Sequence, residues 1–244
     1  MHRMKLFLMM VSFVALPACD HEPTAARDFA PPPVSPPVAV DYPELLTRLA
    51  AKRRELENDR RQHNESEKLV AAARLLYCQI FAELAGQWMG TPWDFNGTTQ
   101  MPRTSKIACG YFVTTLLRDA GFDVERAKLG QQASEIIART MTTREFMRAR
   151  SEEPLGTFVD ACRKHLPGVY LVGLDFHTGY LVNDGTHLWF VHAAYGRDAQ
   201  HVLVEKAAES TYLLNSKYRH VAFLTEDPKF LLGWLAGKKW VTAK

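Results

Sequence analysis

The sequence predicts an α+β fold in which N-terminal helices and one cysteine-bearing helix pack on a small antiparallel sheet. Two observations favour this class. Up to about residue 120, apolar side chains recur at the spacing of amphipathic helices. From residue 169 onward, short runs rich in β-branched and aromatic residues alternate with turn signals, as strands of a meander do. With 244 residues, 47% of them hydrophobic, the chain can build one large core.

The first nineteen residues have the features of an export signal. Basic Arg3 and Lys5 precede an apolar run over 6–16, about half the roughly 20 residues that span a bilayer. The run ends in Leu-Pro-Ala-Cys19, which resembles the bacterial lipoprotein box. The resemblance implies cleavage before Cys19 and acylation of that cysteine, which would anchor the protein to a bacterial envelope membrane, facing the periplasm. The alternative is an ordinary signal peptide cut near Ala18.

The charge balance gives no sign of a polyanionic partner. The formal net charge is +3. Without Arg3 and Lys5, 28 of the 30 basic residues remain against 27 acidic ones, a net charge of +1. A nearly neutral chain lacks the excess of positive charge that indicates a nucleic-acid partner.

Composition shifts divide the chain into five segments. A signal peptide over 1–18 precedes a proline-rich tether over 19–40, N-terminal helices over 41–85, a domain over 86–228, for which the motifs described below imply a catalytic function, and an aromatic, basic segment over 229–244. The tether should be extended and would hold the folded part away from a lipid surface.

Two long helices should follow the tether. Their apolar positions predict helices over 42–62 and 67–88, with a break at 63–66. The charge run over 52–61 is interpreted as a solvated face with internal ion pairs.

Cys109 should lie in the first turn of the next helix. Ser105 is the expected cap, apolar residues recur between positions 113 and 120, and Gly121 provides the stop. A thiol in this position faces unpaired N–H groups and the positive end of the helix dipole, which favour the thiolate. The alternative is that Cys109 is a small buried core residue, because free cysteine is among the most buried types.

The C-terminal half should contain a block of helices and then a sheet. The block is expected over 131–141, 143–150 and 155–165, and strands over 169–174, 177–183, 186–194, 202–205 and 220–224. Asn183-Asp184-Gly185 is a strong hairpin signal. On the strand expected over 177–183, which leads into this hairpin, His177 and Gly179 should lie on one face. Phe230 to Trp240 could lie on a membrane surface or form a packed terminal helix.

Three motifs occur in a fixed order: Gly-Thr-Pro-Trp at 90–93 before the cysteine helix, His-Thr-Gly at 177–179 after a Pro-Gly strand start, and Phe-Val-His-Ala at 190–193. Together they resemble the NlpC-type cell-wall cysteine peptidases, a branch of the papain-like fold, over roughly residues 86–225. The resemblance implies a papain-like domain that needs no cofactor.

The resemblance also implies roles for individual residues. Cys109 would be the nucleophile, His177 the base and His192 the group that orients the base, a constellation that cysteine catalysis requires. Trp93 takes the place of a tyrosine that supports the oxyanion site, and Gly110 and Gly179 would line that oxyanion and substrate region. The implied activity is hydrolysis of an amide bond in peptidoglycan peptides or another envelope substrate.

This chain departs from the family at the nucleophile. The family's Asp-Cys-Ser-Gly is Ala108-Cys109-Gly110-Tyr111 here, so the groups that read the substrate have changed. The substrate therefore does not follow from the resemblance. A non-catalytic binding or scaffold module, and acyl transfer to an amine through the same thioester, remain alternatives.

Two further alternatives concern the cysteines. A zinc site from Cys109, His177 and His192 lacks any Cys-x-x-Cys or His-Glu-x-x-His spacing. Cys78 and Cys162 could form a disulfide in an oxidising compartment, or stay as two separately buried thiols.

Overall fold

The computed structural model describes residues 30–31, 40–63, 67–196 and 199–244. The expected signal peptide, the lipidation site Cys19, nearly all of the expected tether and most of the expected break at 63–66 lie outside the described residues. The described helices are α1 (Tyr42–His63), α2 (Glu67–Trp88), α3 (Cys109–Asp119), α4 (Arg126–Gly130), α5 (Ser134–Met141), α6 (Leu155–Arg163), α7 (Thr211–Asn215) and α8 (Pro228–Leu235). The strands are β1 (Asp123–Val124), β2 (Met147–Ser151), β3 (Gly168–Leu174), β4 (Thr178–Asn183), β5 (Leu188–Ala193), β6 (Val202–Lys206), β7 (Tyr218–Ala222) and β8 (Lys239–Trp240).

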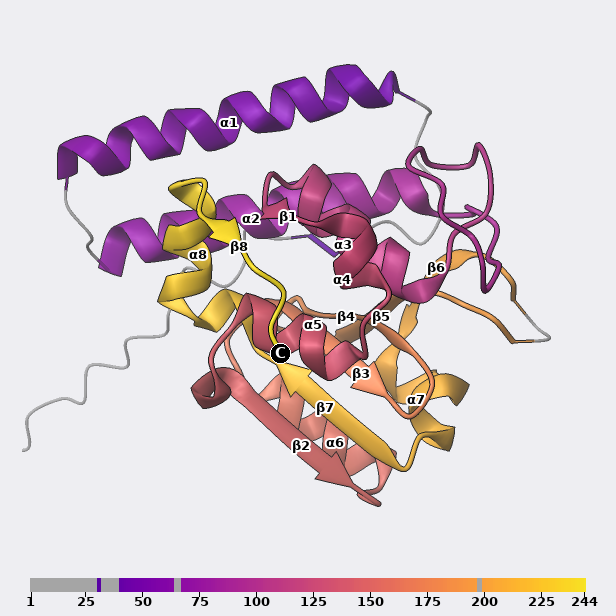
Figure 1. Ribbon diagram of the computed structural model, residues 1–244. Helices are drawn as coiled ribbons and strands as arrows, with labels where there is room; N and C mark the ends of the chain where they lie inside the picture. The colour runs from indigo at the N-terminus through magenta and orange to yellow at the C-terminus, as the bar shows by residue number, and fades with distance from the viewer. Residues whose placement is uncertain (1–29, 32–39, 64–66, 197–198) are drawn as a thin grey trace, which may run out of the picture.

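The fold is a mixed α+β arrangement around one antiparallel sheet, as predicted. Six strands pair in the order β2-β7-β3-β4-β5-β6, and β1 and β8 form a separate parallel pair. Residues that alternate along the strands belong to two cores on opposite faces of the sheet. The larger core holds the apolar sides of α1, α2, α3, α5 and α8, whereas α6 and α7 cover the other face (Figure 1).

The hairpin and the strands around it agree with the sequence to within two residues at either end. Gly185 in the turn has a φ of 88°, a conformation that glycine adopts without strain. The Asn183 side chain accepts from the Gly185 N–H at 3.0 Å, and Asp184 accepts from Thr186 and His187. These bonds fix the register of β4 against β5, on which the site depends.

The segment 143–150 is not the predicted helix. A single 3₁₀ turn (Arg144–Phe146) leads into β2, which pairs with β7 over five residues. The arginines and methionine of this segment are good helix formers, but tertiary pairing with an open sheet edge overrides that preference.

The start of α3 also differs from the prediction. Ser105 does not cap it, because Ile107 still pairs in isolated bridges with Trp93 and Thr98. The chain is therefore extended up to Ala108, which stands at the N-cap position without a side-chain hydrogen bond. At the other end Gly121, with a φ of 98°, follows the last turn as expected.

The N-terminal helices and the C-terminal segment pack into one core. Arg53 donates to the Trp234 carbonyl at 2.6 Å, and the Trp234 indole donates to the Ala120 carbonyl at 2.7 Å. Trp234 and Trp240 are buried, which agrees with the packed alternative for the C-terminal segment and not with a membrane-surface helix.

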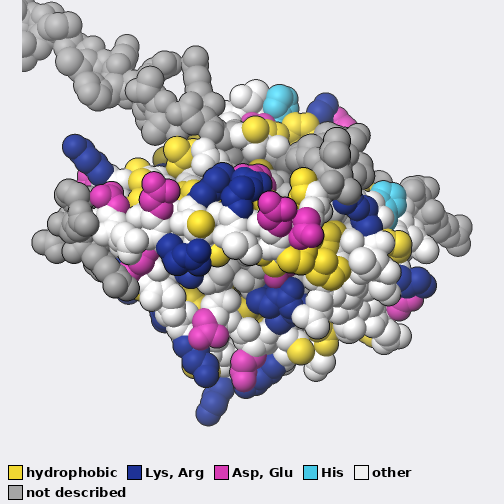
Figure 2. All heavy atoms as spheres, turned by 90° about the horizontal axis from the view of Figure 1, so that it is seen from above, with side chains coloured by type: hydrophobic (Ala, Val, Ile, Leu, Met, Phe, Trp, Pro, Cys, Tyr) yellow, Lys and Arg dark blue, Asp and Glu magenta, His cyan; other side chains and the backbone are white. Residues whose placement is uncertain are grey.

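The surface of α1 carries interspersed basic and acidic side chains (Figure 2). Arg48 and Lys52 both pair with Glu83 on α2, and Arg60 pairs with Glu57. Exposed Arg54 and Glu55 agree with the expected solvated face, whereas Arg53 and Glu57 of the same charge run pack into the protein. Among the described helices, α2 alone is long and apolar enough to cross a membrane, and half of its most apolar window is buried inside the protein.

Candidate functional site

Cys109 is the first residue of α3 and is partly exposed. The helix is held against the sheet by its buried face and by the Tyr180 hydroxyl of β4, which donates to the Val113 carbonyl at 2.8 Å. This contact places the N-terminal end of α3 beside the beginning of β4.

The thiol does not have the lowered pKa that its helix position suggests. Burial raises the pKa of Cys109 above its usual value, and hydrogen bonds from the backbone of Gly110 and Thr178 offset only part of that rise. A buried thiolate would lose solvation that the helix end does not replace. The resting group is therefore the neutral thiol at neutral pH.

His177, the residue before β4, and His192 on β5 lie side by side. His177 Nε2 and His192 Nδ1 are 2.8 Å apart, and both side chains are buried. Burial holds the pKa of His177 well below its usual value, and the neighbouring His192 lowers it further. Burial likewise lowers the pKa of His192. Both imidazoles are therefore neutral at neutral pH.

The structure brings the Cys109 thiol to the backbone beside His177. The two side chains lie on different faces of the sheet: α3 packs on the face that carries Tyr180, whereas the rings of His177 and His192 pack with Phe190 on the other. The thiol contacts the backbone of Thr178, which directly follows His177 in the chain. In the described part of the chain, His177 Nδ1 is buried without a hydrogen-bond partner, so no hydrogen bond joins it to the Cys109 sulfur. A buried polar atom without a partner is uncommon, and catalytic hydrogen bonds are often loose before substrate binds.

After His177 Nδ1, the second buried atom of the site without a partner among the described residues belongs to Trp93, near the N-terminal end of α3. Its indole nitrogen is buried and has no partner among the described residues, although its ring lies 5.8 Å from that of Tyr195. Trp93 also bridges to Ile107, two residues before the cysteine. An unsatisfied donor in this position is available to an oxygen atom of a ligand.

The two glycines of the predicted site are closely packed. A Cβ on Gly110 would lie 2.3 Å from the Gly130 carbonyl oxygen, so Gly110 lets α3 and α4 approach. A Cβ on Gly179 would lie 2.8 Å from both the His192 Cβ and the Phe190 ring. Gly179 therefore leaves room for the ring of His192, which stacks on Phe190 with centroids 4.0 Å apart.

Sequence reasoning missed Glu205 on β6. Its Oε1 lies 3.3 Å from His192 Nε2, on the opposite side of that ring from His177. Burial raises its pKa, but hydrogen bonds from His192 and Ser210 outweigh this and hold the pKa of Glu205 below its usual value. The signal that could have found it is the alternation along 202–206, which puts Glu205 on the face of the sheet opposite the apolar Val202 and Val204.

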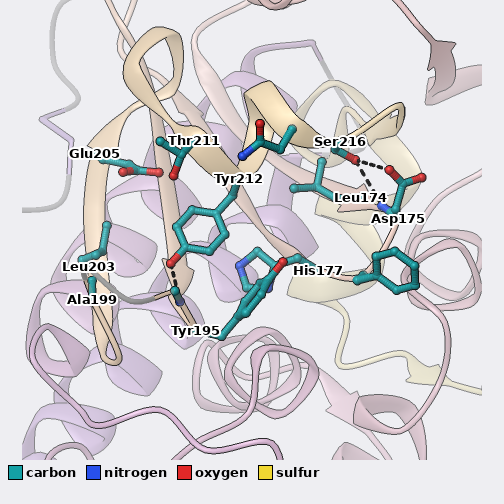
Figure 3. Close-up of a pocket in the computed structure, with 13 residues that line it drawn as sticks. Leu174, Asp175, His177, Tyr195, Ala199, Leu203, Glu205, Thr211, Tyr212 and Ser216 are labelled. Carbon is teal, nitrogen blue, oxygen red and sulfur yellow. Dashed lines mark hydrogen bonds between the residues drawn. The ribbon is translucent and has the colours of Figure 1, made fainter.

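A pocket of about 610 Å³ opens beside His177. In Figure 3, His177 lies between the rings of Tyr195 and Tyr212, with Glu205 on one side and Asp175 on the other. The Tyr212 hydroxyl accepts from the Gly196 N–H at 2.7 Å, which holds that wall in place. Leu174, Phe176, Gly196, Ala199, Leu203, Thr211, Asn215 and Ser216 complete the lining. The lining contains two carboxylates and, among the described residues, no lysine or arginine.

The remaining cysteines stand apart from the site. Cys78 and Cys162 are buried, free thiols in cores on opposite faces of the sheet, so the disulfide alternative is wrong and the alternative of two buried thiols is confirmed. Burial raises the pKa of each to about 12. Within the described residues, no group of three or more His, Cys, Asp or Glu side chains is arranged to hold a metal ion.

Comparisons with protein-family models, with curated proteins and with solved structures found no match.

Proposed function

We propose that the protein is a cysteine hydrolase of the bacterial cell envelope that cleaves an amide bond in peptidoglycan peptides. One observation carries the proposal: the Cys109 thiol lies at the backbone beside His177, whose Nε2 is bonded to His192 and whose Nδ1 is unpartnered. A nucleophile, a base and a group that orients the base are the parts that acyl transfer through a thiol requires. Anchoring at Cys19 would hold this site near its substrate.

The proposed reaction has two steps. The Cys109 sulfur attacks the amide carbon while its proton passes to His177 Nδ1, and the imidazolium then gives that proton to the leaving amine as the C–N bond breaks. Water next attacks the thioester, with His177 as base, and releases the carboxylic acid and the thiol. In this proposal, the Trp93 indole N–H and backbone N–H groups at the start of α3 donate to the oxyanion.

A neutral thiol and a neutral imidazole suit this mechanism. Because burial disfavours both charged forms, the ion pair would form only as the thiol attacks. The pocket beside His177 could receive one side of the substrate. Its two carboxylates favour a neutral or cationic group there over an anionic one.

A non-catalytic binding module is the second candidate, favoured by the raised pKa of Cys109 and by the absence, in the described part of the chain, of a hydrogen bond between the thiol and His177. Such a module would use the same pocket without turning over a ligand.

Mass spectrometry of purified muropeptides, after incubation with the protein, separates these candidates. Hydrolysis should add the mass of water at one amide bond, and Cys109→Ala should abolish the product while Cys162→Ala, a change at a buried thiol of α6 outside the site, should retain it. Products in which an added amine replaces water would indicate acyl transfer. Unchanged muropeptides with the wild-type protein would contradict this choice of substrate.

A further inference from the structure

Glu205 on β6, His192 on β5 and His177, the residue before β4, form a continuous chain of polar contacts. Phe190 pairs with Glu205 and His192 with Leu203, so the Glu205 and His192 side chains are diagonal neighbours on one face. The contacts run from Glu205 Oε1 to His192 Nε2 at 3.3 Å and from His192 Nδ1 to His177 Nε2 at 2.8 Å. Both ring nitrogens of His192 are therefore engaged.

The protonation of each group in this chain determines the next. An ionised carboxylate only accepts hydrogen bonds, so His192 Nε2 must carry a proton. A neutral imidazole carries one proton, which leaves His192 Nδ1 as an acceptor. His177 Nε2 must then donate to it, and His177 Nδ1 is left as an unprotonated nitrogen.

Without the carboxylate, the same two rings could form the same hydrogen bond with donor and acceptor exchanged. His192 Nδ1 could carry its proton and donate to His177 Nε2, which would put the His177 proton on Nδ1. A protonated Nδ1 cannot accept a proton from a thiol. Two imidazoles alone therefore leave the proton acceptor undetermined, and an anchored acceptor on the far side of His192 removes the ambiguity.

We propose that Glu205 is a positioning residue, which fixes the tautomers of His192 and His177 so that His177 Nδ1 is free to take the proton of Cys109. The kinetic part of this proposal rests on the hydrolase function proposed above, whereas the tautomers themselves do not. Stacking of His192 on Phe190, with an interplanar angle of 11°, holds the ring in the plane that both contacts need.

Other groups around the chain do not compete for these protons. His192 faces Tyr212 with ring centroids 4.7 Å apart, and the charge of His201 acts on it only at a distance. Glu205 accepts from the Ser210 side chain as well as from His192, which favours its ionised form. The Tyr212 hydroxyl oxygen accepts from the Gly196 N–H.

Long-range ¹H–¹⁵N NMR of the ¹⁵N-histidine-labelled full-length protein at pH 7 tests the tautomers directly. The signals can be assigned with His177→Gln and His192→Gln variants. In the wild-type protein both rings should give the pattern of the Nε2–H tautomer. An Nδ1–H pattern for either ring would overturn the proposal, and this result needs no Glu205 variant that folds.

Variants at Glu205 then test its role. Glu205→Ala should raise the Nδ1–H population of His177 at least about tenfold, the ratio that corresponds to 1.4 kcal/mol. Glu205→Gln replaces an obligatory acceptor with an amide that can also donate to His192 Nε2, so it should raise the Nδ1–H population of His177 as well. Glu209→Ala, which removes an exposed carboxylate from the turn after β6, is the matched control and should change neither ring. Unchanged tautomers in Glu205→Ala would overturn the assignment.

Kinetics distinguish this proposal from the proposed function. With an active substrate, Glu205→Ala should lower kcat about tenfold or more with KM nearly unchanged, and Glu205→Gln, whose amide does not fix the tautomer, should not recover the loss. Hydrolysis with an unchanged kcat in Glu205→Ala would overturn the role of Glu205 and leave the hydrolase proposal standing. No hydrolysis by the wild-type protein would contradict the function, and the NMR result would stand.

Discussion

Replacing His177 with glutamine should change how the stability of the protein depends on pH. The residue is 4% exposed, and burial holds the pKa of its imidazole well below the usual value. Between that lowered pKa and the ordinary value of about 6.5, the unfolded chain binds a proton at this position and the folded protein does not. The free energy of unfolding should therefore rise with pH through this window and fall as the solution is acidified below about pH 6.5.

The magnitude follows from the proton difference. At pH 5.5 an unfolded histidine carries about 0.9 of a proton, so His177 alone should contribute a slope of about 1.2 kcal/mol per pH unit. Glutamine does not titrate, and its amide can still donate to His192 Nδ1. His177→Gln should thus remove this slope, whatever the substitution costs at pH 7. His220, whose pKa burial lowers, and Asp119, whose pKa burial raises with the opposite effect on the slope, are present in both proteins and cancel.

Urea unfolding at half-unit steps between pH 5 and 7 measures the two slopes. His187→Gln is the matched control, because that side chain is 52% exposed and remains in contact with solvent in both states. Equal slopes for wild-type and His177→Gln proteins below pH 6 would refute the reasoning, since His177 would then be protonated in the folded protein.

Four further predictions concern other residues. Iodoacetamide should label Cys109 before the two buried thiols, at a rate that rises with pH, and equal rates would count against an accessible site. Cys19→Ser should move the protein from the detergent phase to the aqueous phase in a partition assay, because acyl chains make the expected anchor; retention in detergent would argue for another membrane contact. Gly110→Ala should cost about 1–3 kcal/mol in urea unfolding because its Cβ would meet a backbone oxygen, whereas Gly156→Ala has open space and should cost nothing. Trp93→Phe should lower kcat by about a hundredfold if the indole donates to the oxyanion, and an unchanged kcat would exclude that role.

The sequence predicted the strands better than it predicted the approach to the site. Strands β3 to β6 carry strong local signals, because β-branched and aromatic runs are bounded by a hairpin whose turn residues determine its register. The helical prediction for 143–150 was wrong because β2 exists only through pairing with β7, which follows about 70 residues later in the chain. Local propensity contains no information on such a partner.

In the candidate site, too, features with a local sequence signal were predicted and features set by tertiary packing were not. His177 and His192 were predicted together from their places on neighbouring strands, and their contact follows from the β4–β5 register. The electrostatics of Cys109 could not be predicted, because the helix position favours the thiolate whereas the burial that opposes it depends on the packed sheet. Glu205 was missed because its partner is set by the diagonal pairing of β5 and β6, which no local pattern reveals.

The edge strand β2 has a consequence for association between copies of the protein. Its residues from Arg148 to Ser151 are exposed, and guanidinium groups at Arg148 and Arg150 line a backbone that has a partner on one side only. A second copy that added its own β2 to this edge would bring like charges together, as lysine and arginine do on the outer strands of many sheets. These two arginines therefore oppose growth of the sheet into a fibre or an edge-to-edge dimer, and they do so at the end of the sheet farthest from β6 and Glu205.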